Sequence, residues 1–325
     1  MNQQRFHELH GRQWQEFEQW LDCMTSKRRT DAHPPPFGES DLPHRYRTLC
    51  QHLALARDRQ YSPALVERLD RLVIRAHQFM YGSHPEAGPA VLRFFTADFA
   101  RTVRAHRHVV ALAFLLFFGP LFLLGALTRA DADIAHMIMP VEQIAAYERM
   151  YDPRPETTGR AASIDAYMFG HYIWNNIRIG FQTFAGGLLL GLGSVFFLTT
   201  NGVIIGTTAG YLIGSGRGPN FLSFVCGHSA FELTGIVLMG AGGLMLGAAL
   251  LFPGRSTRVA ALRANARAAV PLVCGAGALL TLAAFVEAFW SPLAGIPVSV
   301  KYGVGAALWI LVAAYFGLAG RYRAA

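Results

Sequence analysis

Long apolar runs restrict the fold of this chain more than any other feature of its sequence. An α-helix needs roughly 20 mainly apolar residues to cross the hydrocarbon layer of a bilayer. Several runs approach that length, and we expect about six spans, at residues 108–127, 173–199, 203–216, 222–252, 270–290 and 303–320. The third would measure about 21 Å as a helix, so we expect it to be short or broken. The sequence therefore predicts an all-α, polytopic helical membrane protein.

The first 107 residues contain no such run and predict a separate helical domain. Apolar side chains recur there at helical spacing in three stretches, and again over residues 89–107, where the pattern continues without a break into the first span. The clearest stretch contains Leu65, Leu69, Leu72 and Ala76. We therefore expect a cytosolic helical bundle over residues 1–107, followed by a transmembrane domain over residues 108–325.

The distribution of charge predicts how the chain is oriented. Residues 128–172 contain four arginines and seven acidic side chains, whereas residues 254–269 contain four arginines and no acid. Because loops rich in Lys and Arg stay in the cytoplasm, we expect 128–172 to be external and both chain ends to be cytoplasmic. The net charge is +8, but residues 1–107 hold 16 basic and 12 acidic side chains, an ordinary soluble mixture. No nucleic-acid partner is therefore expected, and the lipid bilayer is the expected surrounding.

Glycines at four-residue spacing predict close helix packing within the membrane. A ridge without side chains lets the backbone of a second helix approach, which is how many helices associate in lipid. The ridge consists of Gly202, Gly206, Gly210 and Gly214, and the same spacing recurs at Gly243 and Gly247. The spacing leaves two uses open, namely packing within one chain and packing across a homodimer.

Ionisable and amide side chains within the apolar spans predict a polar intramembrane cluster. His228 and Glu232 lie one helical turn apart. Arg178, Glu232 and Glu287 all fall near the outer boundary of the bilayer when depth is counted at about 1.5 Å per residue. We expect Arg178 to pair with Glu232, because a lone charge at that depth is costly; interfacial anchoring is the alternative role for Arg178. The candidate residues are His171, Asn175, Asn176, Arg178, Gln182, His228, Glu232 and Glu287.

Several of these residues lie in strings that resemble a known protein family. The strings are residues 167–179, 183–187, 201–202 and 227–234. On these strings the chain resembles the stage II sporulation protein M family of bacterial integral membrane proteins, over roughly residues 40–255. The resemblance implies a multi-pass protein of the bacterial cytoplasmic (inner) membrane.

The resemblance also implies a role in organising other proteins. The family's namesake looks like a membrane scaffold that localises cell-wall hydrolases. Members that resemble this chain in having a long cytosolic helical region tend to be associated with AAA-type ATPases and von Willebrand A-domain proteins. The family supplies no catalytic residue and no cofactor to transfer, so none is assigned.

Three functions follow as hypotheses. We favour a non-enzymatic scaffold, because two soluble regions flank a glycine-packed membrane core. The alternative is a channel or transporter that uses Arg178, His228 and Glu232 together with a broken glycine-rich helix. An intramembrane hydrolase fits less well, because the zinc protease pattern HExxH needs a second His that does not follow His228. No metal ligands are therefore assigned from the sequence.

Overall fold

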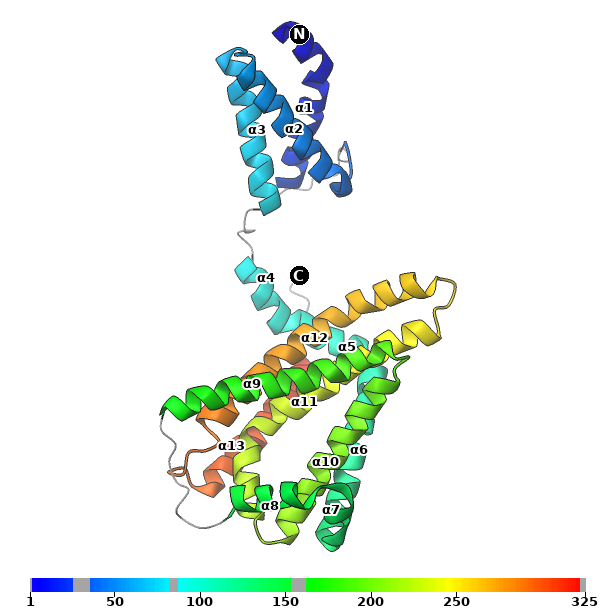
Figure 1. Ribbon diagram of the computed structural model, residues 1–325, viewed down its shortest axis with the longest axis vertical. Coiled ribbons are helices and arrows are strands. Elements are labelled where there is room, and N and C mark those ends of the chain that lie inside the picture. Colours follow the sequence, from blue (N-terminus) through cyan, green and yellow to red (C-terminus); the bar gives the residue numbers. More distant parts are fainter. Residues whose placement is uncertain (1, 26–35, 82–86, 153–161, 322–325) are drawn as a thin grey trace. The chain divides into compact units, whose positions relative to one another are not determined.

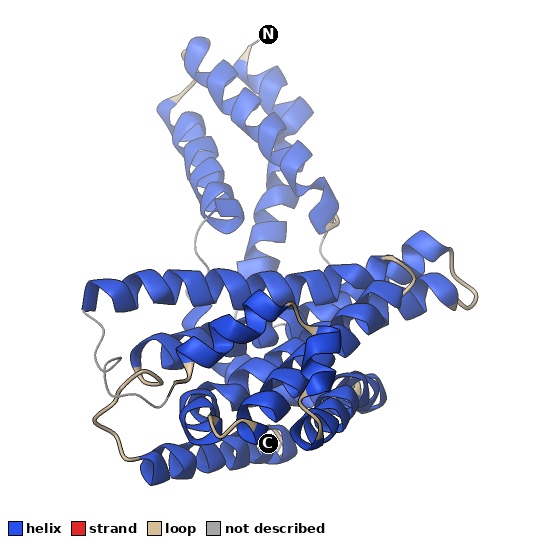
Figure 2. Cartoon of the chain, turned by 60° about the horizontal axis from the view of Figure 1, so that its bottom comes forward, coloured by secondary structure: helices blue, strands red, loops and turns tan. Residues whose placement is uncertain are grey.

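The computed structural model describes residues 2–25, 36–81, 87–152 and 162–321. Every regular element in these ranges is helical, as Figure 2 shows in blue. The chain divides into two compact units, Met1–Ala90 and Val91–Ala325. The predicted all-α class is therefore confirmed. Residues 153–161 of the expected external loop lie outside the described residues.

The first unit is a bundle of three helices, α1 (Gln3–Thr25), α2 (Leu42–Asp58) and α3 (Pro63–Tyr81), with a single 3₁₀ turn at Glu39–Asp41 before α2 (Figure 1). The predicted apolar stripe of α3 is buried in its core. Trp20 stacks on the ring of Phe37 at 5.1 Å and donates to the Phe37 carbonyl at 2.9 Å. The loop before α2 is thereby fixed against α1.

The second unit contains all the remaining helices. They are α4 (Ala87–Arg93, which begins in the first unit), the π-helical turn η2 (Phe94–Asp98), α5 (Phe99–Ala105), α6 (Arg107–Ala130), α7 (Asp133–Ile138), α8 (Val141–Met150), α9 (Ala162–Ala185), the 3₁₀ turn η4 (Gly186–Leu188), α10 (Leu192–Gly214), α11 (Gly218–Leu251), α12 (Arg258–Phe289) and α13 (Val298–Leu318). Among the described helices, five are long and apolar enough to cross a membrane, namely α6, α10, α11, α12 and α13. The chain is thus a multi-pass membrane protein.

The boundary between the units lies at Ala90 rather than at the predicted residue 107. Phe99 of α5 is buried in the core of the second unit, where its ring lies 5.3 Å from that of Phe316. Arg104 donates to the carbonyl oxygens of Phe316 and Ala319 at the end of α13. These contacts explain why residues 91–107 pack with the membrane helices.

The predicted spans at 173–199 and 203–216 were wrong. The chain turns at η4 and at Leu190 and Gly191, which both have positive φ. This turn lies inside the predicted span 173–199, and α10 then continues as one unbroken helix through residues 200–202, where the sequence predicted a break. Glycines make this turn possible, because a Cβ at Gly187 would overlap the carbonyl of Gly243 in α11. A turn made by glycines inside a continuous apolar run is difficult to see in the sequence, since neither Pro nor a charge marks it.

The glycine ridge of α10 packs against α6 within the same chain (Figure 1). A Cβ at Gly202 would meet the Phe117 carbonyl, and one at Gly210 would meet the Gly125 carbonyl. The contact advances by eight residues on both helices, so α6 and α10 run in the same direction. Of the two uses left open by the sequence, the structure therefore assigns this ridge to packing within the chain.

Contacts between the other helices give their relative directions. α11 and α12 are antiparallel, because Gly235 faces Leu280 whereas Gly242 faces Val273. By the same test α9 runs in the direction of α11, because Gly180 faces Met239 whereas Gly187 faces Gly243. α13 also runs in this direction, because Lys301 contacts Cys226 whereas Trp309 contacts Ser229. Successive long helices therefore alternate in direction, and residues 252–257 lie at the opposite end of this unit from α7 and α8 (Figure 1).

Candidate functional site

The polar site lies between α11 and α12, where three of the predicted residues meet. His228 and Glu232 share one face of α11, and Glu287 projects from the last turn of α12. One ligand-type atom from each of the three lies within 4.8 Å of the others. His228 Nε2 is 3.7 Å from Glu232 Oε2. The structure thus brings an imidazole and two carboxylates together inside helices able to span a membrane.

Two glycines allow α12 to approach α11 closely enough for this meeting. A Cβ at Gly227 would overlap the ring of Trp290, and one at Gly235 would overlap the side chain of Leu280. These contacts lie on either side of His228 and Glu232 along α11. The small residues therefore set the distance at which Glu287 reaches the other two side chains.

His228 is held in a defined orientation by residues that the sequence interpretation missed. The residue is 4% exposed, and its Nδ1 lies 3.0 Å from the hydroxyl of Ser291. The carbonyl of Ser291 accepts a hydrogen bond of 2.7 Å from Nζ of the buried Lys301 in α13. In the tautomer whose Nδ1–H donates to the Ser291 hydroxyl, Nε2 carries no proton and its lone pair faces the carboxylates.

Tyr151, directly after α8, covers the side of the site nearest the helix ends. Its ring packs edge-on against Phe221 at 5.3 Å and against Phe224 at 6.0 Å, and Phe224 in turn packs against His228 at 5.6 Å. Burial raises the pKa of Tyr151 above its usual range, and the Glu287 carboxylate adds to this effect. The phenol therefore stays neutral near the acidic residues, where it can donate or accept a hydrogen bond.

The remaining predicted residues belong to α9 and do not join these three side chains. Asn176 is buried and accepts a hydrogen bond of 3.4 Å from Asn175, while its own Nδ2 has no hydrogen-bond partner among the described residues. The other three, His171, Arg178 and Gln182, are exposed.

The expected ion pair between Arg178 and Glu232 was wrong, since the described residues contain no such contact. Asn176 and Gly180 mark the face of α9 that packs on the bundle. Arg178 lies two positions from each of them, which is about 200° around a helix of 3.6 residues per turn. Its side chain therefore points away from the site.

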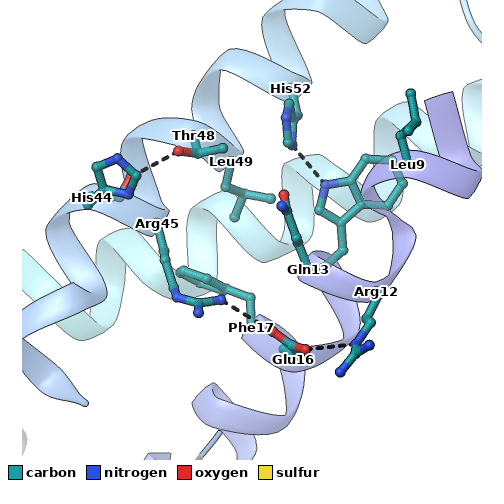
Figure 3. A pocket seen from close by; sticks show the side chains of 11 residues that line it. Leu9, Arg12, Gln13, Glu16, Phe17, His44, Arg45, Thr48, Leu49 and His52 are labelled. Atoms are coloured by element: carbon teal, nitrogen blue, oxygen red, sulfur yellow. Dashed lines mark hydrogen bonds and ion pairs between the residues drawn. The ribbon is translucent and has the colours of Figure 1, made fainter. Parts of the chain in front are cut away.

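A second candidate site is an open groove of about 500 Å³ between α1 and α2 of the first unit (Figure 3). Glu16 lies between two arginines there, 3.1 Å from Arg12 and 3.4 Å from Arg45. At the other end, Trp14 Nε1 donates to His52 Nδ1 at 3.1 Å. The groove thus combines fixed charges with apolar and aromatic walls.

Comparison with known protein families finds one match in each of the two units. Residues 110–292 match the family model described as Stage II sporulation protein M. Residues 4–82 match the model described as Domain of unknown function (DUF8413). The chain matches no curated protein and no solved structure. The first match covers more than half of the chain and includes all three side chains of the polar site. The chain therefore belongs to the Stage II sporulation protein M family.

Proposed function

We propose that this protein is a scaffold that positions partner proteins at the bacterial cytoplasmic membrane. The observation that carries the proposal is that one chain joins a helical unit with its own core and an open groove to a multi-pass membrane unit. The groove offers a partner paired charges beside the exposed apolar side chain of Leu9. The membrane unit supplies a rigid anchor, because its helices approach through glycines.

The proposed partners are AAA-type ATPases or von Willebrand A-domain proteins on the cytoplasmic side. This part of the proposal rests on the family resemblance. The proposed orientation is supported by the charge distribution, because the arginine-rich residues 254–269 begin at the end of the helix unit opposite α7 and α8. The six long helices α6, α9, α10, α11, α12 and α13 alternate in direction, so the proposal includes a crossing by α9 in addition to the five apolar helices. Both chain ends are then cytoplasmic, and α7 and α8 face outward.

Photo-crosslinking in native membranes tests the scaffold directly. A photoreactive amino acid replaces Gln13, an exposed residue that lines the groove. The matched control carries the same group at Ile74, an exposed residue of α3 outside the groove. We expect an adduct of defined mass from position 13 and none from position 74. Purification of the wild-type chain without partners, together with no adduct at either position, would contradict the scaffold.

A second candidate function is ion or proton transport, which the polar site favours. Ionisable side chains within spanning helices are costly and commonly mark transport paths. One of the two features behind this idea is lost, however, because α10 is a continuous helix and not a broken one. Flux into proteoliposomes that is unchanged by Glu232→Gln would contradict transport.

A further inference from the structure

We infer that His228, Glu232 and Glu287 form a binding site for one divalent transition-metal cation. One atom from each side chain lies within 4.8 Å of the others. Zinc-type ions bind His nitrogen and carboxylate oxygen at about 2.0 to 2.2 Å, so two ligand atoms on one ion are separated by roughly 3 to 4 Å. The three side chains thus need only small rotamer adjustments to reach a common ion.

The distance between His228 and Glu232 fits an ion better than a direct bond. His228 Nε2 and Glu232 Oε2 are 3.7 Å apart. A hydrogen bond between these atoms would be about 2.7 to 3.2 Å long. Two atoms that bind the same ion at an angle near 110° would lie about 3.4 Å apart. The observed separation of 3.7 Å is therefore closer to the distance between two ligands of one metal ion than to the length of a hydrogen bond.

The surroundings of His228 match those of a metal-bound histidine. Such a residue nearly always donates its second ring N–H to an oxygen, which fixes the tautomer and directs the free nitrogen to the ion. Here the hydroxyl of Ser291 lies 3.0 Å from Nδ1, on the side of the ring away from Glu232. Lys301 in turn holds the Ser291 carbonyl at 2.7 Å. Through these two hydrogen bonds Ser291 acts as a positioning residue for the His228 ring. The Lys301 ammonium group contacts the Ser291 carbonyl and not the Glu232 carboxylate.

The donor set selects the class of cation. Mg²⁺ and Ca²⁺ prefer six or more oxygen ligands, whereas one imidazole and two carboxylates suit Zn²⁺, Mn²⁺ or Fe²⁺. α11 alone offers two ligands, His228 and Glu232, and Glu287 supplies the third from a different helix. The carboxylate side of the site is the more open one, since the Glu232 side chain is 20% exposed whereas that of His228 is 5% exposed. This inference is independent of the scaffold proposal.

Cobalt absorption spectroscopy tests the site in the full-length chain. The protein is purified in detergent without a histidine tag, stripped with a chelator and titrated with Co²⁺, whose visible bands report nitrogen and oxygen coordination. We expect about one Co²⁺ per chain, displaced by Zn²⁺ and not by Mg²⁺. Glu232→Gln and Glu287→Gln should each weaken binding at least tenfold. The matched controls Glu142→Gln and His171→Asn change exposed residues outside the site and should bind as the wild type does.

A further variant keeps the test valid if loss of a carboxylate prevents folding. Ser291→Ala retains all three ligands, and we expect it to weaken Co²⁺ binding about 10- to 100-fold, as loss of such an outer partner does. Ser291→Thr keeps the hydroxyl and should restore binding. Absence of a Co²⁺ spectrum in the wild type would overturn the inference. Equal affinity in the wild type, Glu232→Gln and Glu287→Gln would overturn it as well.

Discussion

At the residue scale, a buried lysine links α13 to the polar site. Lys301 is 6% exposed and is the single charged side chain of α13. Its ammonium group donates to the backbone carbonyl of Ser291, and the side-chain hydroxyl of Ser291 faces His228. A buried polar group is costly unless it is hydrogen-bonded, so the lysine and the carbonyl depend on each other. A lone lysine in an apolar helix was the sequence signal that could have identified this link.

We expect Lys301→Met to lower the free energy of unfolding by about 1 to 3 kcal/mol, because the buried Ser291 carbonyl would lose its donor. The measurement is the thermal unfolding of the purified chain in detergent, followed by tryptophan fluorescence. Val300→Met introduces the same side chain at an exposed neighbouring position and should change the Tm little. Equal shifts in the two variants would contradict the proposed role of Lys301.

His52 should make the stability of the first unit depend on pH. Burial and the nearby His10 lower the pKa of His52 to about 4. In the unfolded chain a histidine titrates near pH 6.5, so between about pH 6.5 and 4 the unfolded chain binds a proton that the folded bundle does not. Stability should therefore be full above about pH 6.5 and decline as the pH falls towards 4.

Hydrogen exchange of the full chain measures this effect locally. We expect peptides from α1 and α2 to lose protection between pH 7 and pH 5, after correction for the intrinsic exchange rate. His52→Gln keeps an acceptor for Trp14 and removes the titration, so it should reduce the change. His44→Gln, at an exposed position, should leave it intact. Constant protection across this range would contradict the assignment.

The residue scale also shows what the sequence could predict about the site. Counting depth along each span placed Glu232 and Glu287 at one level, because helical rise is nearly constant. The face of α9 was harder to predict, since its polar stripe could point inward to the cluster or outward as an anchor. Gly180 packs against Met239 and Leu280, so the side of α9 that carries Gly180 faces the bundle. Arg178 is thereby directed outward.

At the scale of elements, backbone contacts at glycine decide how α10 packs. A helix with side chains along this ridge could not lie so close to α6, because a Cβ at Gly202 would overlap the Phe117 carbonyl. The sequence predicted the ridge correctly from its spacing. It could not identify the partner helix, since a homodimer would use the same pattern.

We expect Gly202→Val to destabilise the chain by about 1 to 3 kcal/mol or more, since it forces α10 away from α6. Gly119→Val is the matched control in α6, because a Cβ there would meet no atom within 4 Å. The Tm values of both variants in detergent provide the measurement. A Tm for Gly202→Val close to that of Gly119→Val would show that the ridge does not pack as described.

At the scale of the whole molecule, the second unit has two ends of different character. α7 and α8 lie at one end, together with Tyr151 beside the polar site. The arginine-rich start of α12 and the turn after α9 lie at the other end. The site thus lies towards the end that we propose to be external, while the first unit and its groove are proposed to be cytoplasmic.

Cysteine labelling in intact cells tests this orientation. In a chain whose four native cysteines are replaced by serine, we introduce Met137→Cys in α7 or Leu189→Cys after α9, which are 83% and 68% exposed. A membrane-impermeant maleimide should label position 137 in intact cells and position 189 only after permeabilisation. Labelling of position 189 alone in intact cells would reverse the orientation.

The central claim is that carboxylates from α11 and α12 share one polar site with His228. A double-mutant cycle between Glu232→Gln and Glu287→Gln, measured by thermal unfolding of the chelated chain, tests it most directly. Because groups in contact are not independent, we expect a coupling energy of about 0.5 to 3 kcal/mol, whereas the distant pair Glu232 and Glu142 should be additive. Additivity of Glu232 and Glu287 to within about 0.3 kcal/mol would contradict the shared site.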